Sequence, residues 1–318
     1  MFNSKIIGHG HYLPAKILIN DDFKKFVDTS DEWIFSRTGI KQRHIAQKSE
    51  LTSNLAIEAT KMALNSAKLT ANEIDFIIVA TTTPDNTFPS TATKVQNFFK
   101  ISNVPSFDLQ AVCSGFIYSL QVADSLIKSG NAKKILVVGA ETLSKIVDWT
   151  DRRTCVLFGD GAGALILEAT NEDKGILSSK LFSDGNWHKS LYADGGPSVN
   201  QTVGKIRMNG QDIFKHAVNK LSESTEICLE NCNLKIEEID WLIPHQANQR
   251  IISSTAKKIG ISEDKTISTV KYHANTSAAS IPLALSTSIE NGQVKKGDII
   301  AMCAIGGGLT WGSCILKL

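Results

Sequence analysis

Short apolar runs alternate with longer amphipathic segments along the chain. An extended run at residues 5–8 precedes a helix-like segment at 51–69, and the apolar run 76–80 follows it, bounded by polar residues. Short apolar runs are typical of buried strands, whereas apolar residues at helical spacing indicate helices packed on one face. This alternation predicts an α/β fold with buried strands.

The same pattern occurs twice in the chain. Residues 73–78 resemble residues 238–243 at an offset of 165 positions. A helix-like stretch, a Lys-Lys pair and a strand at 113–139 resemble 276–303, where the lysine pairs are 162 positions apart. Two matches in the same order and at nearly one offset indicate structural repeats. We therefore expect two similar halves, at residues 1–170 and 171–318.

The repeat brings three polar side chains into correspondence. Adding the offset of 162 to Cys113 gives Asn275, and adding 165 to Ala80 gives His245. If the halves pack about a pseudo-twofold axis, Cys113 and Asn275 begin equivalent helices. His245 then lies just beyond the end of a strand, where side chains of α/β folds face a crevice. The sequence predicts that these three groups converge.

Cys113 is the candidate nucleophile, since it follows a short apolar strand and begins a helix. Its small neighbours Ser114 and Gly115 leave room for a substrate. Unpaired N–H groups and the helix dipole at this position predict a thiol pKa below the ordinary value of about 8.5. The alternative is plain packing, because free cysteine is among the most buried residue types.

His245 and Asn275 have structural alternatives as well. A lone histidine is more often structural than catalytic, and only its position in the repeat distinguishes His245. Asparagine is a common helix N-cap, and spacing alone leaves capping as the favoured interpretation of Asn275.

Two glycine-rich segments have separate interpretations. The segment 159–163 does not match the dinucleotide-binding fingerprint, and it precedes a β-like run at 164–167 where that fingerprint needs a helix. We predict a tight turn with close backbone packing there. The segment 306–308 lies between two strands, and such a loop can direct a backbone N–H at a reacting oxygen.

Composition excludes several classes of function. The 318 residues include 42% hydrophobic residues, enough for a large core, and the formal net charge of +2 gives no general nucleic-acid-binding field. Six scattered cysteines indicate neither a disulfide framework nor a zinc site, so we expect no metal. The N-terminus lacks the apolar region of a signal peptide, and no run reaches the roughly 18 apolar residues of a membrane span. We expect a cytoplasmic protein that binds neither nucleic acid nor membrane.

Seven motifs extend along nearly the whole chain: 31–34 (DEWI), 37–40 (RTGI), 113–116 (CSGF), 158–163 (FGDGAG), 244–248 (PHQAN), 273–277 (HANTS) and 306–312 (GGGLTWG). With these motifs the chain closely resembles the ketoacyl-acyl-carrier-protein synthase III family, the initiating enzymes of type II fatty-acid synthesis within the thiolase superfamily. The resemblance implies a duplicated, five-layered α/β/α/β/α thiolase-like fold and a homodimer.

The resemblance also implies a reaction. Cys113 would attack the thioester of a short acyl-CoA, with acetyl-CoA as the expected primer, and release coenzyme A. Malonyl-acyl-carrier protein would then lose carbon dioxide, and its carbanion would attack the acyl group. Neutral His245 and Asn275 would stabilise the enolate, while the backbone N–H groups of Cys113 and Gly307 would hold the oxyanion. The coenzyme A thioester is a substrate, so no cofactor is expected.

Binding residues follow from the resemblance alone. Phe88 would reach across the dimer into the acyl pocket of the partner, and Ile305 stands where the family commonly has phenylalanine. The residues implied for coenzyme A are Trp33, Arg37, Arg152, Gly210, Phe214, Ala247 and Asn248. Those implied for the carrier protein are Lys215, Arg250, Lys257 and Lys258, each of which, taken singly, is also consistent with a solvated surface.

Three other functions fit parts of this pattern. A homologue could load a different acyl group for biotin, quinolone or polyketide synthesis with the same catalytic set. An inactive carrier-protein-binding scaffold is disfavoured because Cys113, His245 and Asn275 are all present. A dinucleotide-dependent oxidoreductase is disfavoured because its glycine fingerprint is missing.

Overall fold

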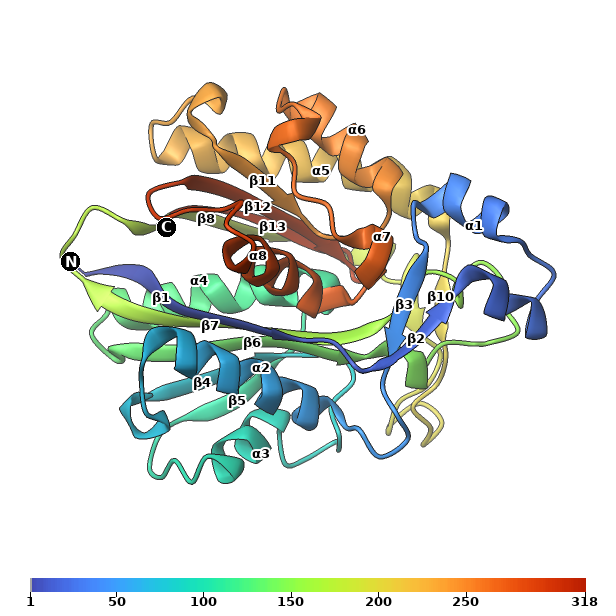
Figure 1. Cartoon of the computed structure of the whole chain (residues 1–318), viewed down its shortest axis with the longest axis horizontal. Helices are drawn as coiled ribbons and strands as arrows, with labels where there is room; N and C mark the ends of the chain where they lie inside the picture. Colours follow the sequence, from blue (N-terminus) through green and yellow to red (C-terminus); the bar gives the residue numbers. More distant parts are fainter. Residues whose placement is uncertain (1) are drawn as a thin grey trace.

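In the computed structural model, residues 2–318 form five alternating layers of helices and sheets (Figure 1). One sheet has five strands, and its central strands are buried along almost their whole length because helices cover both faces. In sheet order these strands are β1 (Asn3–Tyr12), β7 (Asp160–Thr170), β6 (Lys134–Thr142), β4 (Phe76–Ala80) and β5 (Ser106–Leu109). Helices α2 (Thr52–Ala67) and α3 (Thr91–Phe98) cover its outer face.

The second sheet lies on the other side of the molecule and has four strands. In sheet order they are β11 (Trp241–Pro244), β12 (Ile299–Gly306), β13 (Thr310–Lys317) and β8 (Gly175–Ser183). Helices α5 (Gly210–Asn231) and α6 (Gln249–Ile259) cover its outer face, at the top of Figure 1.

The middle layer consists of α4 (Gly115–Lys128) and α8 (Ser280–Glu290), which lie between the two sheets (Figure 1). Both helices are buried on most sides since each contacts apolar side chains above and below. A single core cluster joins Val137 of the first sheet, Phe116 of α4 and Met302 of the second sheet. The two halves of the chain therefore share one core, and the expected boundary after residue 170 falls between β7 and β8.

The strand arrangement confirms the duplication. In the first half β4 and β6 are parallel, while β7 is antiparallel to both β6 and β1. In the second half β11, β12, β13 and β8 repeat this order and these directions. The counterpart of β5 is reduced to a parallel bridge between Leu242 and Thr266. The predicted thiolase-like α/β fold is correct.

The glycine-rich segment at 159–163 differs from its prediction. Most of it belongs to β7, so the predicted tight turn is wrong. The close packing is real: a Cβ on Gly163 would lie 2.5 Å from the backbone nitrogen of Leu283 in α8. These glycines bring strand and helix together instead of reversing the chain.

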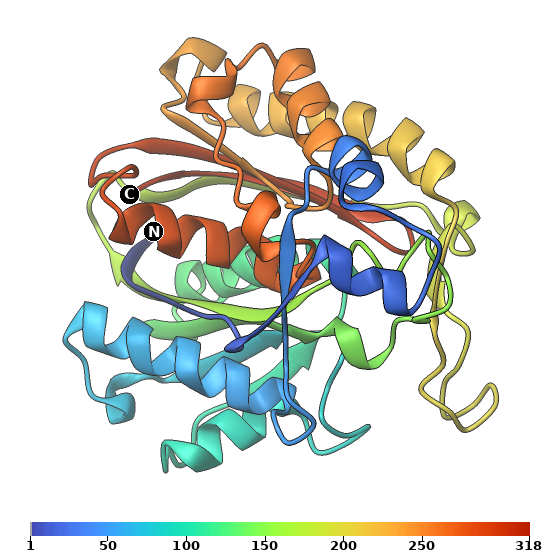
Figure 2. The same ribbon diagram turned by 45° about the vertical axis from the view of Figure 1, so that its right-hand side comes forward.

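Smaller elements surround one end of the layers, at the right of Figure 1. They are β2 (Lys16–Ile19), α1 (Asp31–Thr38), β3 (Gln42–Ile45), β9 (Leu191–Ala193), β10 (Ile206–Met208) and α7 (Val270–His273). Figure 2 shows the yellow segment between β9 and β10 extending away from the layers. No helix within residues 2–318 is long and apolar enough to cross a membrane.

Candidate active site

The three predicted side chains come from three different elements and meet in one pocket. Cys113 lies in the 3-10 turn η3 (Val112–Ser114), which leads directly into α4. Asn275 precedes the equivalent turn η8 (Ser277–Ala279), which leads into α8, and His245 directly follows β11. All three are buried, with 4%, 4% and 6% of Cys113, His245 and Asn275 exposed, and all three line the same cavity.

Asn275 is held by its backbone and by one side-chain oxygen. Its backbone N–H donates to the Leu157 carbonyl at 3.0 Å, and its carbonyl accepts from Gly159 at 2.9 Å. The Asn275 Oδ1 accepts from the Ser277 backbone N–H at 2.9 Å. The N-cap of the following turn is Thr276, so Asn275 is not the N-cap that the alternative interpretation predicted. Its amide NH₂ group is left as a donor.

His245 is positioned by a serine that the sequence analysis did not single out. The His245 Nδ1 lies 2.7 Å from Ser280 Oγ, and its backbone N–H donates to the Cys303 carbonyl at 2.8 Å. Burial lowers the pKa of His245 to about 3, so the imidazole is neutral at physiological pH. Ser280 is the first residue of α8 and lies three positions after the HANTS motif. Its partner His245 follows a strand, β11, that lies far away in the sequence.

The thiol of Cys113 does not have the low pKa that its helix-start position predicts. Burial raises the pKa to about 12, and the nearby Glu141 carboxylate also raises it, while the Ser277 hydroxyl lowers it. Desolvation of the thiolate outweighs the helix dipole in the resting protein. The prediction of a lowered pKa is wrong, and the resting thiol carries its proton.

The second glycine-rich segment approaches the nucleophile closely. A Cβ on Gly306 would lie 2.6 Å from the backbone nitrogen of Cys113, and one on Gly307 would lie 2.5 Å from the Leu191 carbonyl oxygen. Only glycine allows this approach. The end of β12 therefore brings the start of the glycine loop beside the Cys113 backbone.

Two cavities meet at Cys113. One, of about 130 Å³, contains the catalytic candidates together with Ile305. The other, of about 120 Å³, also includes Cys113 in its lining and is lined mainly by apolar side chains such as Leu143, Ile146 and Ile206. This arrangement can hold an extended thioester with its carbonyl at the thiol.

Comparisons with known proteins agree with this geometry. Residues 107–185 match the family model of 3-oxoacyl-[acyl-carrier-protein (ACP)] synthase III, and residues 229–318 match the model of its C-terminal part. The beta-ketoacyl-[acyl-carrier-protein] synthase III of Rickettsia bellii is 55% identical over 98% of this chain and 99% of its own length. The chain belongs to the beta-ketoacyl-acyl-carrier-protein synthase III family. It is accordingly an acyltransferase that initiates fatty-acid synthesis by condensation.

Solved structures of this family superpose on the chain almost completely. The crystal structure of 3-oxoacyl-[acyl-carrier-protein] synthase III from Aquifex aeolicus has a TM-score of 0.95 and 50% identity, covering 99% of this chain and 100% of that one. The priming beta-ketosynthase of the R1128 polyketide biosynthetic pathway has a TM-score of 0.94 at 30% identity, covering 99% and 96%.

The residues that the resemblance implies for coenzyme A form two adjoining groups in this synthase III chain. One group surrounds Trp33, and the other lines the cavity that contains His245. The guanidinium carbons of Arg37 and Arg152 lie 4.8 and 4.6 Å from the centre of the Trp33 ring, so both cations stack on the indole. Asn248 Nδ2 donates to the Arg37 carbonyl at 3.0 Å, which ties this cluster to the cavity. The predicted tunnel residues Gly210, Phe214, Ala247 and Asn248 line the cavity itself.

The basic residues implied for carrier-protein binding lie on two neighbouring helices. Lys215 belongs to α5, whereas Arg250, Lys257 and Lys258 belong to α6, and all four are exposed. The Arg250 guanidinium lies 5.6 Å from the Phe214 ring centre, next to the cavity. A basic face therefore adjoins the cavity mouth of a chain that is nearly neutral as a whole.

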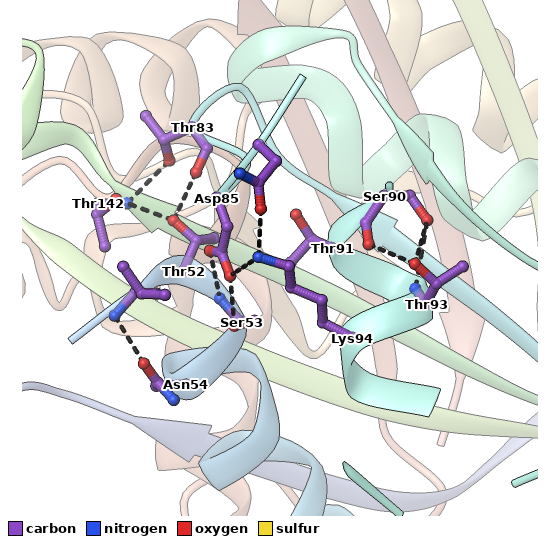
Figure 3. A network of polar contacts seen from close by, with 12 residues as sticks. Thr52, Ser53, Asn54, Thr83, Asp85, Ser90, Thr91, Thr93, Lys94 and Thr142 are labelled. Atoms are coloured by element: carbon purple, nitrogen blue, oxygen red, sulfur yellow. Dashed lines mark hydrogen bonds and ion pairs between the residues drawn. The ribbon is translucent and has the colours of Figure 1, made fainter. Parts of the chain in front are cut away.

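Phe88 is 83% exposed and does not line either cavity of its own chain. Its loop is nevertheless firmly held, as Figure 3 shows. The Asp85 side chain is 1% exposed and accepts hydrogen bonds from Ser53, at 3.0 Å from N and 2.5 Å from Oγ, and from Lys94 Nζ at 3.1 Å. An exposed aromatic side chain on a braced loop is suited to contact another protein surface.

Proposed function

We propose that this synthase III joins a short acyl-CoA to malonyl-acyl-carrier protein through an acyl-Cys113 intermediate, giving 3-oxoacyl-acyl-carrier protein. The observation that carries the proposal is the convergence of Cys113, His245 and Asn275 where two cavities meet. The acyl group occupies the apolar cavity, and the pantetheine arm occupies the cavity on the His245 side.

In the first half-reaction Cys113 Sγ attacks the thioester carbonyl and coenzyme A leaves. The oxyanion is stabilised by the backbone N–H groups of Cys113 and Gly307, at roughly 3 kcal/mol per donor in other enzymes. The contact of Gly306 with the Cys113 backbone supports this pairing.

In the second half-reaction the malonyl group loses carbon dioxide, and the enolate attacks the acyl group on Cys113. Neutral His245 and the Asn275 amide donate hydrogen bonds to the enolate oxygen. A Ser280 hydroxyl that donates to His245 Nδ1 keeps the ring proton on Nε2, where it can serve as that donor. No carbon-bound proton is removed, so this step needs neither a general base nor a cofactor.

The apolar cavity limits the primer. It is small, and among residues 2–318 no charged side chain lines it. A short uncharged acyl group such as acetyl fits this lining, whereas a dicarboxylic primer for biotin synthesis would place a carboxylate there without a cation. Polyketide priming uses the same chemistry, but the synthases III of Rickettsia bellii and Aquifex aeolicus are 55% and 50% identical to this chain, against 30% for the R1128 priming enzyme.

Partner binding extends the proposal to the surface. Trp33 and Arg152 hold the adenine of coenzyme A, with Arg37 near its phosphates, because planar aromatic and guanidinium groups suit a base. The basic face on α5 and α6 receives the acidic carrier protein. The active unit is a cytoplasmic homodimer, in which Phe88 of each subunit closes the acyl cavity of its partner.

The decisive experiment incubates the pure protein with acetyl-, isobutyryl- and glutaryl-CoA, and mass spectrometry identifies any acylated residue before malonyl-acyl-carrier protein is added. We expect acetylation of Cys113, followed by condensation. Cys113→Ser should abolish acyl transfer, whereas His245→Ala should acylate and fail to decarboxylate the malonyl thioester. No acyl mass on Cys113 with any donor would refute the proposal, and equal loss of both half-reactions in His245→Ala would refute the division of roles.

A further inference from the structure

A buried carboxylate with no part in the mechanism described above lies close to the nucleophile. Glu141 belongs to β6 and is fully buried. Its oxygens accept hydrogen bonds from Thr82 N at 3.1 Å and from Thr83 Oγ1 at 2.5 Å, and Thr81 Oγ1 lies at 3.4 Å. Within residues 2–318 no lysine, arginine or histidine forms an ion pair with it. Burial without a cation raises the pKa of Glu141 to about 7.

Ser277 lies near both the carboxylate and the thiol. It lines the apolar cavity together with Cys113 and with Thr82, whose backbone N–H donates to Glu141. Its hydroxyl lowers the pKa of both the Cys113 thiol and the Glu141 carboxyl. The turn η8 that carries Ser277 packs against η3 and against β6, and a Cβ on Gly139 of β6 would lie 2.3 Å from the Ala278 carbonyl oxygen. In the part of the chain that the structure describes, Ser277 Oγ is buried and has no hydrogen-bond partner at ordinary distance.

The first half-reaction needs an acceptor for the thiol proton, since the resting Cys113 is protonated. His245 is a weak acceptor because burial lowers its pKa to about 3. We propose, on the basis of the function proposed above, that the Cys113 proton passes through the Ser277 hydroxyl to Glu141 while Sγ attacks the acyl-CoA carbonyl. Within residues 2–318 Ser277 Oγ has no hydrogen-bond partner in the resting protein, so its contacts with the thiol and the carboxylate form for the transfer, as is common for catalytic groups.

The protons balance over the full cycle. As the Sγ–C bond forms, Ser277 Oγ takes the Cys113 proton and releases its own proton to a Glu141 oxygen. The thioester C–S bond breaks, and the coenzyme A thiolate takes a proton from water. In the second half-reaction the C–C bond forms and the C–Sγ bond breaks. Cys113 then regains its proton through Ser277, and Glu141 returns to its carboxylate form.

The surroundings of Glu141 permit this cycle. The titratable group that faces it is Cys113, across Ser277, and its other contacts are the hydroxyl and backbone groups of threonines 81–83. These donors stabilise the carboxylate enough for it to ionise near neutral pH. Acylation should therefore become faster as the pH rises through about 7, where the pKa of Glu141 lies.

The test compares Ser277→Ala and Glu141→Gln with a matched control, Ser119→Ala, which also removes a buried hydroxyl without a partner. Single-turnover acetylation of Cys113 is followed by quenched flow and mass spectrometry from about pH 5 to about pH 9. We expect acetylation to slow by about 100-fold or more in Ser277→Ala and Glu141→Gln. The rate inflection near pH 7 should disappear in both, and Ser119→Ala should behave like the wild type.

Malonyl-acyl-carrier-protein decarboxylation serves as the fold control, because it depends on His245 and Asn275. It should persist in both relay variants. If Glu141→Gln does not fold, Ser277→Ala decides alone, since its hydroxyl contributes no hydrogen bond to the resting structure. If Ser277→Ala is acetylated as fast as the control Ser119→Ala and keeps the rate inflection near pH 7, the proposed proton transfer through Ser277 is wrong. If the wild type itself is not acetylated, the proposed function fails instead.

Discussion

At the residue scale, two separate features prepare His245 for its role. Burial keeps the imidazole neutral, since its pKa of about 3 lies well below the ordinary value for histidine. The Ser280 hydroxyl, 2.7 Å from Nδ1, holds the orientation of the ring. A substitution of Ser280 can therefore change the orientation of the His245 ring while burial keeps the ring neutral.

Ser280→Ala should slow malonyl-acyl-carrier-protein decarboxylation by about fivefold, the effect of losing one hydrogen bond of about 1 kcal/mol. Acetylation of Cys113 should not change. Decarboxylation by the wild type should show no histidine inflection between about pH 5 and about pH 8, because a lowered pKa means that protonation occurs only below this range. Carbon dioxide release measures the rate. Ser286→Ala removes a serine–histidine contact elsewhere on α8 and is the control; equal slowing in both variants would contradict this role of Ser280.

At the element scale, the packing of the end of β12 against the turn η3 determines where the nucleophile lies. Gly306→Ala places a Cβ 2.6 Å from the Cys113 backbone nitrogen, so one of the two segments must move. A displacement near 1 Å can cost about 100-fold in rate, and overpacking costs about 1–3 kcal/mol in stability. We expect slower acetylation of Cys113 and a lower thermal midpoint. Gly185→Ala is the control, because its Cβ would meet nothing within 4 Å; unchanged acetylation in Gly306→Ala would show that the contact is not needed.

Elements with a clear hydrophobic period were predictable from the sequence, whereas contacts between the halves were not. The repeat located His245 because it follows a recurring apolar strand, and it located Cys113 and Asn275 because each stands at the start of a recurring helix-like segment. The turn predicted at 159–163 failed because those glycines serve the packing of α8 on β7, which local sequence does not encode. The pKa of Cys113 was wrongly predicted because its burial is completed by residues of the other half. Ser280 was missed for a different reason: it contacts a histidine of the same half that lies 35 positions away, and no local pattern encodes that contact.

At the scale of the whole molecule, one core unites both halves while one exposed loop remains without a partner in the chain. The core cluster draws on both sheets and on the middle layer, so the halves are expected to unfold together. Phe88 is the most exposed of the large apolar side chains within residues 2–318. Bracing by Asp85 keeps its loop ordered in the absence of a partner. The proposed homodimer would place a second copy of the chain against this loop.

If Phe88 of each subunit closes the acyl cavity of its partner in a homodimer, two linked results are expected. Sedimentation should give a mass of twice 34.6 kDa, and Phe88→Ala should enlarge the acyl cavity of the opposite subunit. The variant should then accept longer acyl-CoA primers, as measured by acylation of Cys113 across a chain-length series. Phe98→Ala removes an exposed phenylalanine from α3 and should leave the preference unchanged. Because Phe88 lies outside both cavities of its own chain, a changed preference requires a contribution from the partner. A monomeric mass together with an unchanged preference would show that the acyl cavity is closed within one chain.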